Sequence, residues 1–249
     1  MNRKHGSSVF GLIEFAIVAG SIALVTSAAV PQQPASRLSA NEAAAIASLR
    51  AIVLAQAQFK AAVDVDSNCD GMGEYGYLAE LAGTKSMRIC CQGGVPGAGN
   101  TTSDLLQPPL LSPPFGVLSS SSAQCAGYQF QLWLPTFTNP WLPDELRGVR
   151  EDATGGKLAA PFPGPSNCSL FWCCYAWPIQ TGVTGNRAFF VNQRGVVLQS
   201  ANDSATPYTG TDKMPDFGEA YAHVRSMASS LRIGSPGGAD GTTWTKVWP

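Results

Sequence analysis

The longest apolar run of the chain lies near its N-terminus, from Val9 to Val30. Between Lys4 and Arg37, Glu14 is the only residue with a formal charge. A helix of roughly 20 apolar residues crosses the hydrocarbon core of a bilayer. The pattern therefore predicts a leader at residues 1–9 and a membrane helix at residues 10–30. Because a carboxylate in hydrocarbon is costly unless it is paired, Glu14 needs a partner.

A second helix is expected after Pro31 and Pro34, which interrupt the first because proline cannot donate a helical hydrogen bond. Ser39 and Glu42 have the spacing of a capping box, which predicts a helix over residues 39–63. Apolar side chains recur along it at helical spacing, and this indicates a face packed against a domain core. These side chains are Ile46, Leu49, Val53 and Phe59.

Later in the chain the pattern changes to short runs that are typical of strands. They are residues 128–134, 169–179, 188–191, 196–198 and 243–247, with a short helix expected over residues 216–231. Gly195, at the end of the segment 192–195, predicts a hairpin turn. The order of elements predicts an α+β head domain over residues 31–249, in which the long helix packs on one antiparallel sheet of about four strands within residues 128–249. Residues 83–126 and 135–165 are rich in turn-forming residues and are expected to be long loops.

The charge composition narrows the possible functions. Charged residues make up 13% of the 249 residues, and the formal net charge is −1. Lysines and arginines form no basic stripe, so nothing in the sequence indicates nucleic-acid binding. An apolar segment before a weakly charged domain favours a membrane-attached protein whose domain lies outside the cytoplasm.

Seven cysteines follow the apolar run, and their spacing does not suggest zinc. Behind an export segment, disulfides are the expected use of cysteine. Neighbouring side chains of an extended chain point to opposite faces, so the members of each adjacent pair are expected to have different partners. The pairing stays open, and the odd number leaves at least one thiol free or paired between molecules. The candidates are Cys69, Cys90, Cys91, Cys125, Cys168, Cys173 and Cys174.

A polar loop after the second helix has two interpretations. Asp66, Asn68 and Asp70, followed by Gly71, match the first half of a calcium-binding loop of the EF-hand type. Tyr77 stands where the closing acidic residue is expected, and Glu74 or Asp64 would have to replace it. The competing interpretation is a polar turn broken by glycine, and it is the commoner role of such a sequence.

The sequence contains no catalytic motif, so we expect a structural rather than an enzymatic protein. His223 is the only histidine after the apolar run, and no nucleophile elbow, phosphate-binding loop or metalloprotease motif occurs. The acidic pairs Asp144-Glu145 and Glu151-Asp152 are interpreted as a solvated face. Four tryptophans allow either a carbohydrate-binding face or packing in the sheet, and packing is the commoner role of aromatic strand residues. They are Trp133, Trp141, Trp172 and Trp177.

Three interpretations of the N-terminal segment account for its apolar run. It could be a secretory signal peptide cleaved at Ser27-Ala28-Ala29, or a plain membrane anchor. Glu14 favours a third: Phe10 with Glu14 four residues later, Leu12 and Ile13 between them, and Pro31 further on resemble the N-terminus of type IV pilins and type II secretion pseudopilins. Val9 and Gly11 depart from that pattern, which has Gly before the cleavage point and Thr or Ser after the first residue. The passage from residue 41 to residue 81 resembles pilin-like proteins more loosely.

The resemblance implies a pilin-like fold and a processing and assembly pathway. A prepilin peptidase would cleave between Val9 and Phe10, and the new amine on Phe10 would be methylated. Glu14 would then pair with the corresponding amine of a neighbouring subunit, which fixes register because each buried charge is costly alone.

The partners implied are copies of the chain or other pilin-like subunits, the inner-membrane assembly machinery and the membrane. The location implied is the bacterial inner membrane, with the filament in the periplasm or at the cell surface. No cofactor is expected except the possible calcium ion. The alternative function is an anchored or secreted, disulfide-rich binding module for a carbohydrate or a protein.

Overall fold

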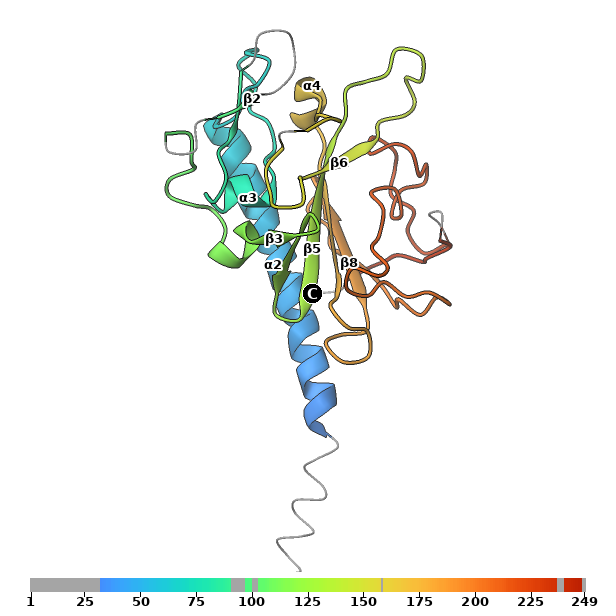
Figure 1. Cartoon of the computed structure of the whole chain (residues 1–249). Helices are drawn as coiled ribbons and strands as arrows, with labels where there is room; N and C mark the ends of the chain where they lie inside the picture. Colours follow the sequence, from blue (N-terminus) through green and yellow to red (C-terminus); the bar gives the residue numbers. More distant parts are fainter. Residues whose placement is uncertain (1–31, 91–96, 100–102, 158, 237–239, 248–249) are drawn as a thin grey trace, which may run out of the picture.

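One long helix packs on an antiparallel sheet in the computed structural model, which describes residues 32–90, 97–99, 103–157, 159–236 and 240–247 (Figure 1). This arrangement confirms the predicted α+β class. The predicted leader at residues 1–9 and membrane helix at residues 10–30 lie outside the described residues. The main sheet has eight strands and begins before residue 128, so the expected sheet was too small.

Helix α2 (Gln32–Ala62) begins at Gln32 and not at the expected Ser39. Pro34 lies in its first turn, where a missing N–H removes no helical hydrogen bond, so this proline does not interrupt the helix. Ser39 is therefore inside the helix and is not its cap. The segment Ala35–Ala62 is long and apolar enough to cross a membrane by length and composition, a test that the core helix of a soluble protein also passes. The first turns of α2 project beyond the sheet at the lower end of the molecule (Figure 1).

The sheet is antiparallel throughout, with the strand order β10-β9-β8-β7-β5-β4-β3, and β6 also pairs with β5. Short strands that the sequence pattern did not indicate, two before β5 and one between β5 and β7, account for the larger strand number. The strands are β3 (Leu118–Ser119), β4 (Ser122–Cys125), β5 (Tyr128–Pro135), β6 (Gly148–Arg150), β7 (Cys173–Pro178), β8 (Ala188–Asn192), β9 (Leu198–Ser200) and β10 (Thr245–Lys246).

Smaller elements lie beside the main sheet. They are helices α3 (Leu78–Leu81) and α4 (Pro165–Cys168), the 3-10 helix η1 (Pro113–Gly116), and a two-stranded sheet of β1 (Arg88–Ile89) and β2 (Gly97–Ala98).

The predicted hairpin between β8 and β9 is confirmed. Phe190 pairs with Leu198, and the Gly195 N–H donates to the Asn192 carbonyl at 2.8 Å. Gly195 has a φ of +71°, the left-handed conformation that glycine adopts without a steric penalty.

Both faces of the sheet are buried. The face toward α2 packs against one side of that helix, with Phe130, Leu132 and Phe189 fully or almost fully buried. The opposite face packs Tyr175, Trp177 and Phe190 into a second apolar cluster. The central strands are therefore covered on both sides, which explains why they read as nearly continuous apolar runs.

The second face is covered by a segment without regular secondary structure, which we term the C-terminal coil (residues 201–236 and 240–244). The helix expected over residues 216–231 does not form. The chain folds back there instead, since Tyr221 bridges to Leu231 and the Ala222 N–H donates to the Ser230 carbonyl at 2.8 Å. The serines and Gly218 of this segment are weak helix formers, so burying Phe217 and Tyr221 on the sheet decides its course.

Candidate functional site

The residues on which the resemblance depends, Val9, Phe10 and Glu14, lie outside the described residues. The described residues show how the helix that follows them is fastened to the head domain. Polar contacts hold α2 at two levels, one near its first turns and one near its last, and a buried network of charges supports the upper level.

The lower contact joins α2 to the loop before β8. The Glu42 carboxylate lies 2.7 Å from the Arg187 guanidinium and accepts hydrogen bonds from the backbone N–H groups of Asn186 and Arg187. Burial alone would raise the pKa of Glu42, but these hydrogen bonds and the Arg187 charge bring it below its ordinary value. The amide of the preceding residue, Asn41, donates to the Thr184 carbonyl at 2.8 Å. These contacts fix the helix against the sheet where it leaves the head.

The upper contact joins α2 to the segment that follows it. The Gln56 amide donates to the Gly76 carbonyl at 2.7 Å and accepts from the Gly76 N–H at 2.9 Å. A Cβ atom at Gly73 would lie 2.0 Å from the Lys60 carbonyl oxygen, and one at Gly76 would lie 2.8 Å from the Phe59 ring. The two glycines therefore allow the backbone to lie directly against the helix.

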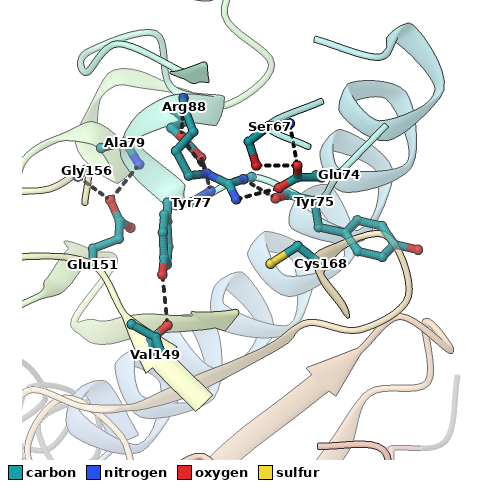
Figure 2. Close-up of polar contacts among 12 residues, drawn as sticks. Ser67, Glu74, Tyr75, Tyr77, Ala79, Arg88, Val149, Glu151, Gly156 and Cys168 are labelled. Atoms are coloured by element: carbon teal, nitrogen blue, oxygen red, sulfur yellow. Dashed lines mark hydrogen bonds and ion pairs between the residues drawn. The ribbon is translucent and has the colours of Figure 1, made fainter. Parts of the chain in front are cut away.

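A fully buried arginine organises this segment (Figure 2). The Arg88 guanidinium forms ion pairs of 2.9 Å with Glu74 and 3.0 Å with Glu80, and it donates to the Tyr75 carbonyl at 2.5 Å. Burial alone would lower the pKa of Arg88, but the Glu80 and Glu74 carboxylates raise it above its ordinary value. Because two carboxylates and backbone oxygen surround one guanidinium, each buried charge has a partner.

Each member of this Arg88 network also holds local backbone. Glu74 accepts from the Ser67 hydroxyl and backbone N–H, which closes the polar loop before it. Glu80 accepts from the Tyr77 N–H at 2.8 Å and so caps the start of α3. The Tyr77 hydroxyl donates to the Val149 carbonyl at 3.1 Å, which joins α3 to β6 (Figure 2).

Glu151 was expected on a solvated face and is instead buried. Its carboxylate accepts hydrogen bonds from the backbone N–H groups of Leu78, Ala79 and Gly156 (Figure 2). Burial is the main cause that raises its pKa to about 8, and the nearby Glu80 carboxylate adds to it. The side chain satisfies N–H groups at the start of α3 that the helix cannot satisfy itself.

The predicted calcium ligands are engaged by their own loop. Asp66 accepts from the backbone N–H groups of Asp70 and Gly71, and Asp70 accepts from the Asn68 amide. Glu74, one of the two proposed replacements for the closing acid, is paired with Arg88. Across the described residues, no group of three or more acidic, histidine or cysteine side chains is placed to hold a metal ion. The geometry therefore favours a polar turn.

One disulfide, Cys69–Cys90, is present among the described residues, and it closes the chain between the polar loop and β1. Cys91 lies outside them. The other disulfide candidates, Cys125, Cys168, Cys173 and Cys174, are free thiols. Cys173 and Cys174 point to opposite faces of the sheet, as expected for neighbours in a strand, but neither has a disulfide partner. Both thiols are fully buried, and burial raises the pKa of each.

The four tryptophans considered as a carbohydrate-binding face divide into two groups. Trp133, Trp172 and Trp177 are buried and pack in the core, as expected. Trp141 is the exception, because 89% of its surface is exposed on the loop between β5 and β6.

No family model matches the chain, and neither a curated protein nor a solved structure matches it.

Proposed function

We propose that the protein is a structural subunit of a type IV pilus-like or type II secretion pseudopilus filament, anchored in the membrane before assembly by residues 10–30. The observation that carries the proposal is the Phe10 to Glu14 pattern at the start of a long uncharged segment. A carboxylate at this place has a use when a neighbouring subunit supplies the matching ammonium group.

The described helix supports the same function. α2 projects beyond the sheet at its lower end, and the Glu42–Arg187 and Gln56–Gly76 contacts fasten it to the head (Figure 1). A helix held in this way transmits load between a filament core and a surface domain.

The outward side of α2 is nearly free of charge, which suits packing against other helices. Between Arg37 and Lys60 its charged residues are Glu42, which is buried, and Arg50, which is exposed. The exposed positions between Arg37 and Lys60 are mostly alanines, and the others are Ser39, Arg50, Leu54 and Gln58. In a filament these small side chains allow neighbouring helices to approach closely.

In this proposal the partners are further copies of the chain or other pilin-like subunits, prepilin peptidase, and the assembly machinery of a bacterial inner membrane. The head domain lies outside the cytoplasm, and the filament is periplasmic or at the cell surface. Phe10 is the mature N-terminus, and the role of the protein is structural rather than enzymatic.

Two experiments in the native cell test the proposal. N-terminal sequencing and the intact mass of the mature protein should show a chain that begins at Phe10 and is heavier by one methyl group. The Glu14→Ala variant should be exported with a folded head but should fail to enter filaments, while the Arg50→Ala variant controls for a charge removed from the exposed side of α2. A chain that keeps Met1, or a Glu14→Ala chain that assembles normally, would contradict the proposal.

A further inference from the structure

Trp141 is the most exposed large apolar residue described in this protein. It lies in the loop between β5 and β6, which Figure 1 places at the end of the head opposite the first turns of α2. Phe137 and Leu142 on the same loop are 46% and 48% exposed. Three large apolar side chains left in water on one loop indicate a site of contact with a ligand or partner.

The loop that carries Trp141 is braced at several points. The backbone N–H of Trp141 donates to the Asn139 side-chain oxygen at 2.9 Å. The backbone N–H of Leu142 donates to the Asn139 carbonyl at 3.0 Å. Glu145 forms ion pairs with Arg147 at 2.9 Å and with Arg225 at 3.0 Å. The second of these reaches the C-terminal coil, so the backbone of the loop is held in place before any ligand arrives.

A cleft of about 530 Å³ opens beside the indole, between this loop and the coil residues 222–225. Its walls include Trp141, Leu142, Asp144, His223 and Arg225. A second cleft of about 510 Å³ shares Asp144 and His223 with the first. The two clefts therefore form one groove, which is longer than the site for a single small molecule. The two clefts together suit an extended ligand more than a single small molecule.

The polar groups of the cleft are available for a ligand. Neither the Asp144 carboxylate nor the His223 imidazole has a hydrogen-bond or ion-pair partner among the described residues. Arg225 is 63% exposed and engages Glu145 through one nitrogen, which leaves other donors of its guanidinium free.

We propose that this groove binds a polysaccharide, with one pyranose ring stacked on the Trp141 indole. The C–H face of a pyranose is apolar and flat enough to cover an indole, while its hydroxyl groups lie around the ring edge. Asp144 accepts hydrogen bonds from those hydroxyls, and His223 and Arg225 supply further partners. A ligand that covered the indole with apolar groups alone would bury Asp144 without a partner and leave the free donors of Arg225 unsatisfied, at a cost in free energy.

The unpaired carboxylate of the groove argues against a nucleic acid. Asp144 has no ion-pair partner among the described residues and would repel phosphates, whereas Glu145 is compensated by Arg147 and Arg225. The position at the far end of the head leaves the groove accessible whether the chain is anchored or assembled. The inference therefore does not depend on the proposed function.

The test uses the full chain in a zwitterionic detergent that has no sugar head group. Retention is measured on insoluble cellulose, chitin, xylan and peptidoglycan, with soluble oligosaccharides of the retained polymer as competitors. We expect retention on at least one polymer and its loss on competition. The Trp141→Ala variant should bind at least tenfold more weakly, and Asp144→Asn should weaken binding by a smaller factor.

The control variant is Val183→Ala, which removes an exposed apolar side chain from another loop and should bind as the wild type does. Because Trp141 is exposed, its replacement should leave the melting temperature unchanged, so lost binding cannot be ascribed to unfolding. Retention on none of the four polymers would overturn the proposal. Equal retention of Trp141→Ala and wild type would also overturn it, as would a Trp141→Ala variant that changes only the self-association of the chain.

Discussion

The sheet is covered by the regular helix α2 on one face and by the irregular C-terminal coil on the other, and both interfaces exclude water. Leu49 and Phe59 on the helix are fully buried, as are Tyr221 and Trp244 in the coil. Burial of apolar area therefore does not require regular secondary structure in the covering segment. What differs is how the backbone of that segment satisfies its hydrogen bonds.

A helix satisfies its own backbone, whereas a coil depends on individual partners. On the coil side these partners are backbone groups, such as the Ser230 carbonyl that accepts from the Ala222 N–H, and side chains of the sheet. The Tyr175 hydroxyl donates to the Phe217 carbonyl at 2.9 Å and accepts from the Ala220 N–H at 3.0 Å. The Trp177 indole N–H donates to the Gly210 carbonyl at 2.8 Å. On the helix side, the ion pairs of Arg88 with Glu74 and Glu80 hold the segment that follows α2.

Removal of the Arg88 charge should give the largest effect on the helix side. In Arg88→Met the apolar stem is retained while Glu74 and Glu80 are left buried without a counter-charge. We expect the free energy of unfolding to fall by about 3–5 kcal/mol. Urea unfolding of the full chain in detergent, followed by near-UV circular dichroism, measures this change.

Arg147→Met is the matched control. The Arg147 side chain is 58% exposed and pairs with Glu145 at the surface, so its loss should cost less than about 1 kcal/mol. If Arg88→Met were no more destabilising than this control, the Arg88 network would not hold the segment that follows α2.

The coil side should respond to the loss of one hydroxyl group. Tyr175→Phe retains the ring but leaves the Phe217 carbonyl and the Ala220 N–H without their partner, which should cost about 1–3 kcal/mol. Hydrogen exchange should rise in the coil more than in α2. Tyr75→Phe, at a half-buried ring, is the control and should change stability by less than about 0.5 kcal/mol. A uniform loss of protection against hydrogen exchange over the whole domain would contradict the prediction that the C-terminal coil is held by contacts of its own.

The sequence predicted the helix side better than the coil side for a physical reason. Helical periodicity is local, so Leu49 and Phe59 reveal their shared face without knowledge of the sheet. The turn at Gly195 is equally local. The predicted start at Ser39 is too late for two reasons: Pro34 lies in the first turn and does not interrupt the helix, and the Ser39 and Glu42 spacing of a capping box occurs inside the helix.

The parts that the sequence did not predict depend on contacts that no local period of the sequence reveals. Glu151 is buried because it meets the start of α3, more than 70 residues earlier. Arg88 joins Glu74 and Glu80, and the scarcity of charge in this chain was the only available hint that such charges pair inside it. The C-terminal coil follows the sheet that it covers, so no period in its own sequence reveals its course. Trp141 lies outside the strands, but so do the buried Trp172 and Trp244, so its place in the sequence pattern does not reveal its exposure.

The smallest expected effect, and the sharpest comparison of the two faces, comes from two adjacent thiols. Cys173 lies in the cluster beneath the coil and Cys174 in the cluster beneath α2, and both are fully buried. If the coil opens before the helix, Cys173 becomes accessible at a denaturant concentration that still protects Cys174. Iodoacetamide labelling of the Cys174→Ser variant reports on Cys173, and labelling of Cys173→Ser reports on Cys174.

Below the unfolding midpoint we expect Cys173 to react at least tenfold faster than Cys174, which corresponds to about 1.4 kcal/mol in the free energy of opening. Rates in fully unfolded chains correct for the intrinsic reactivity of each thiol, and the unfolding midpoints of the two variants correct for any loss of stability. Equal corrected rates would mean that the C-terminal coil and α2 leave the sheet together in one cooperative step. A faster Cys174 would mean that α2 is the weaker cover, and that its polar contacts at Glu42 and Gln56 do not hold it on the head.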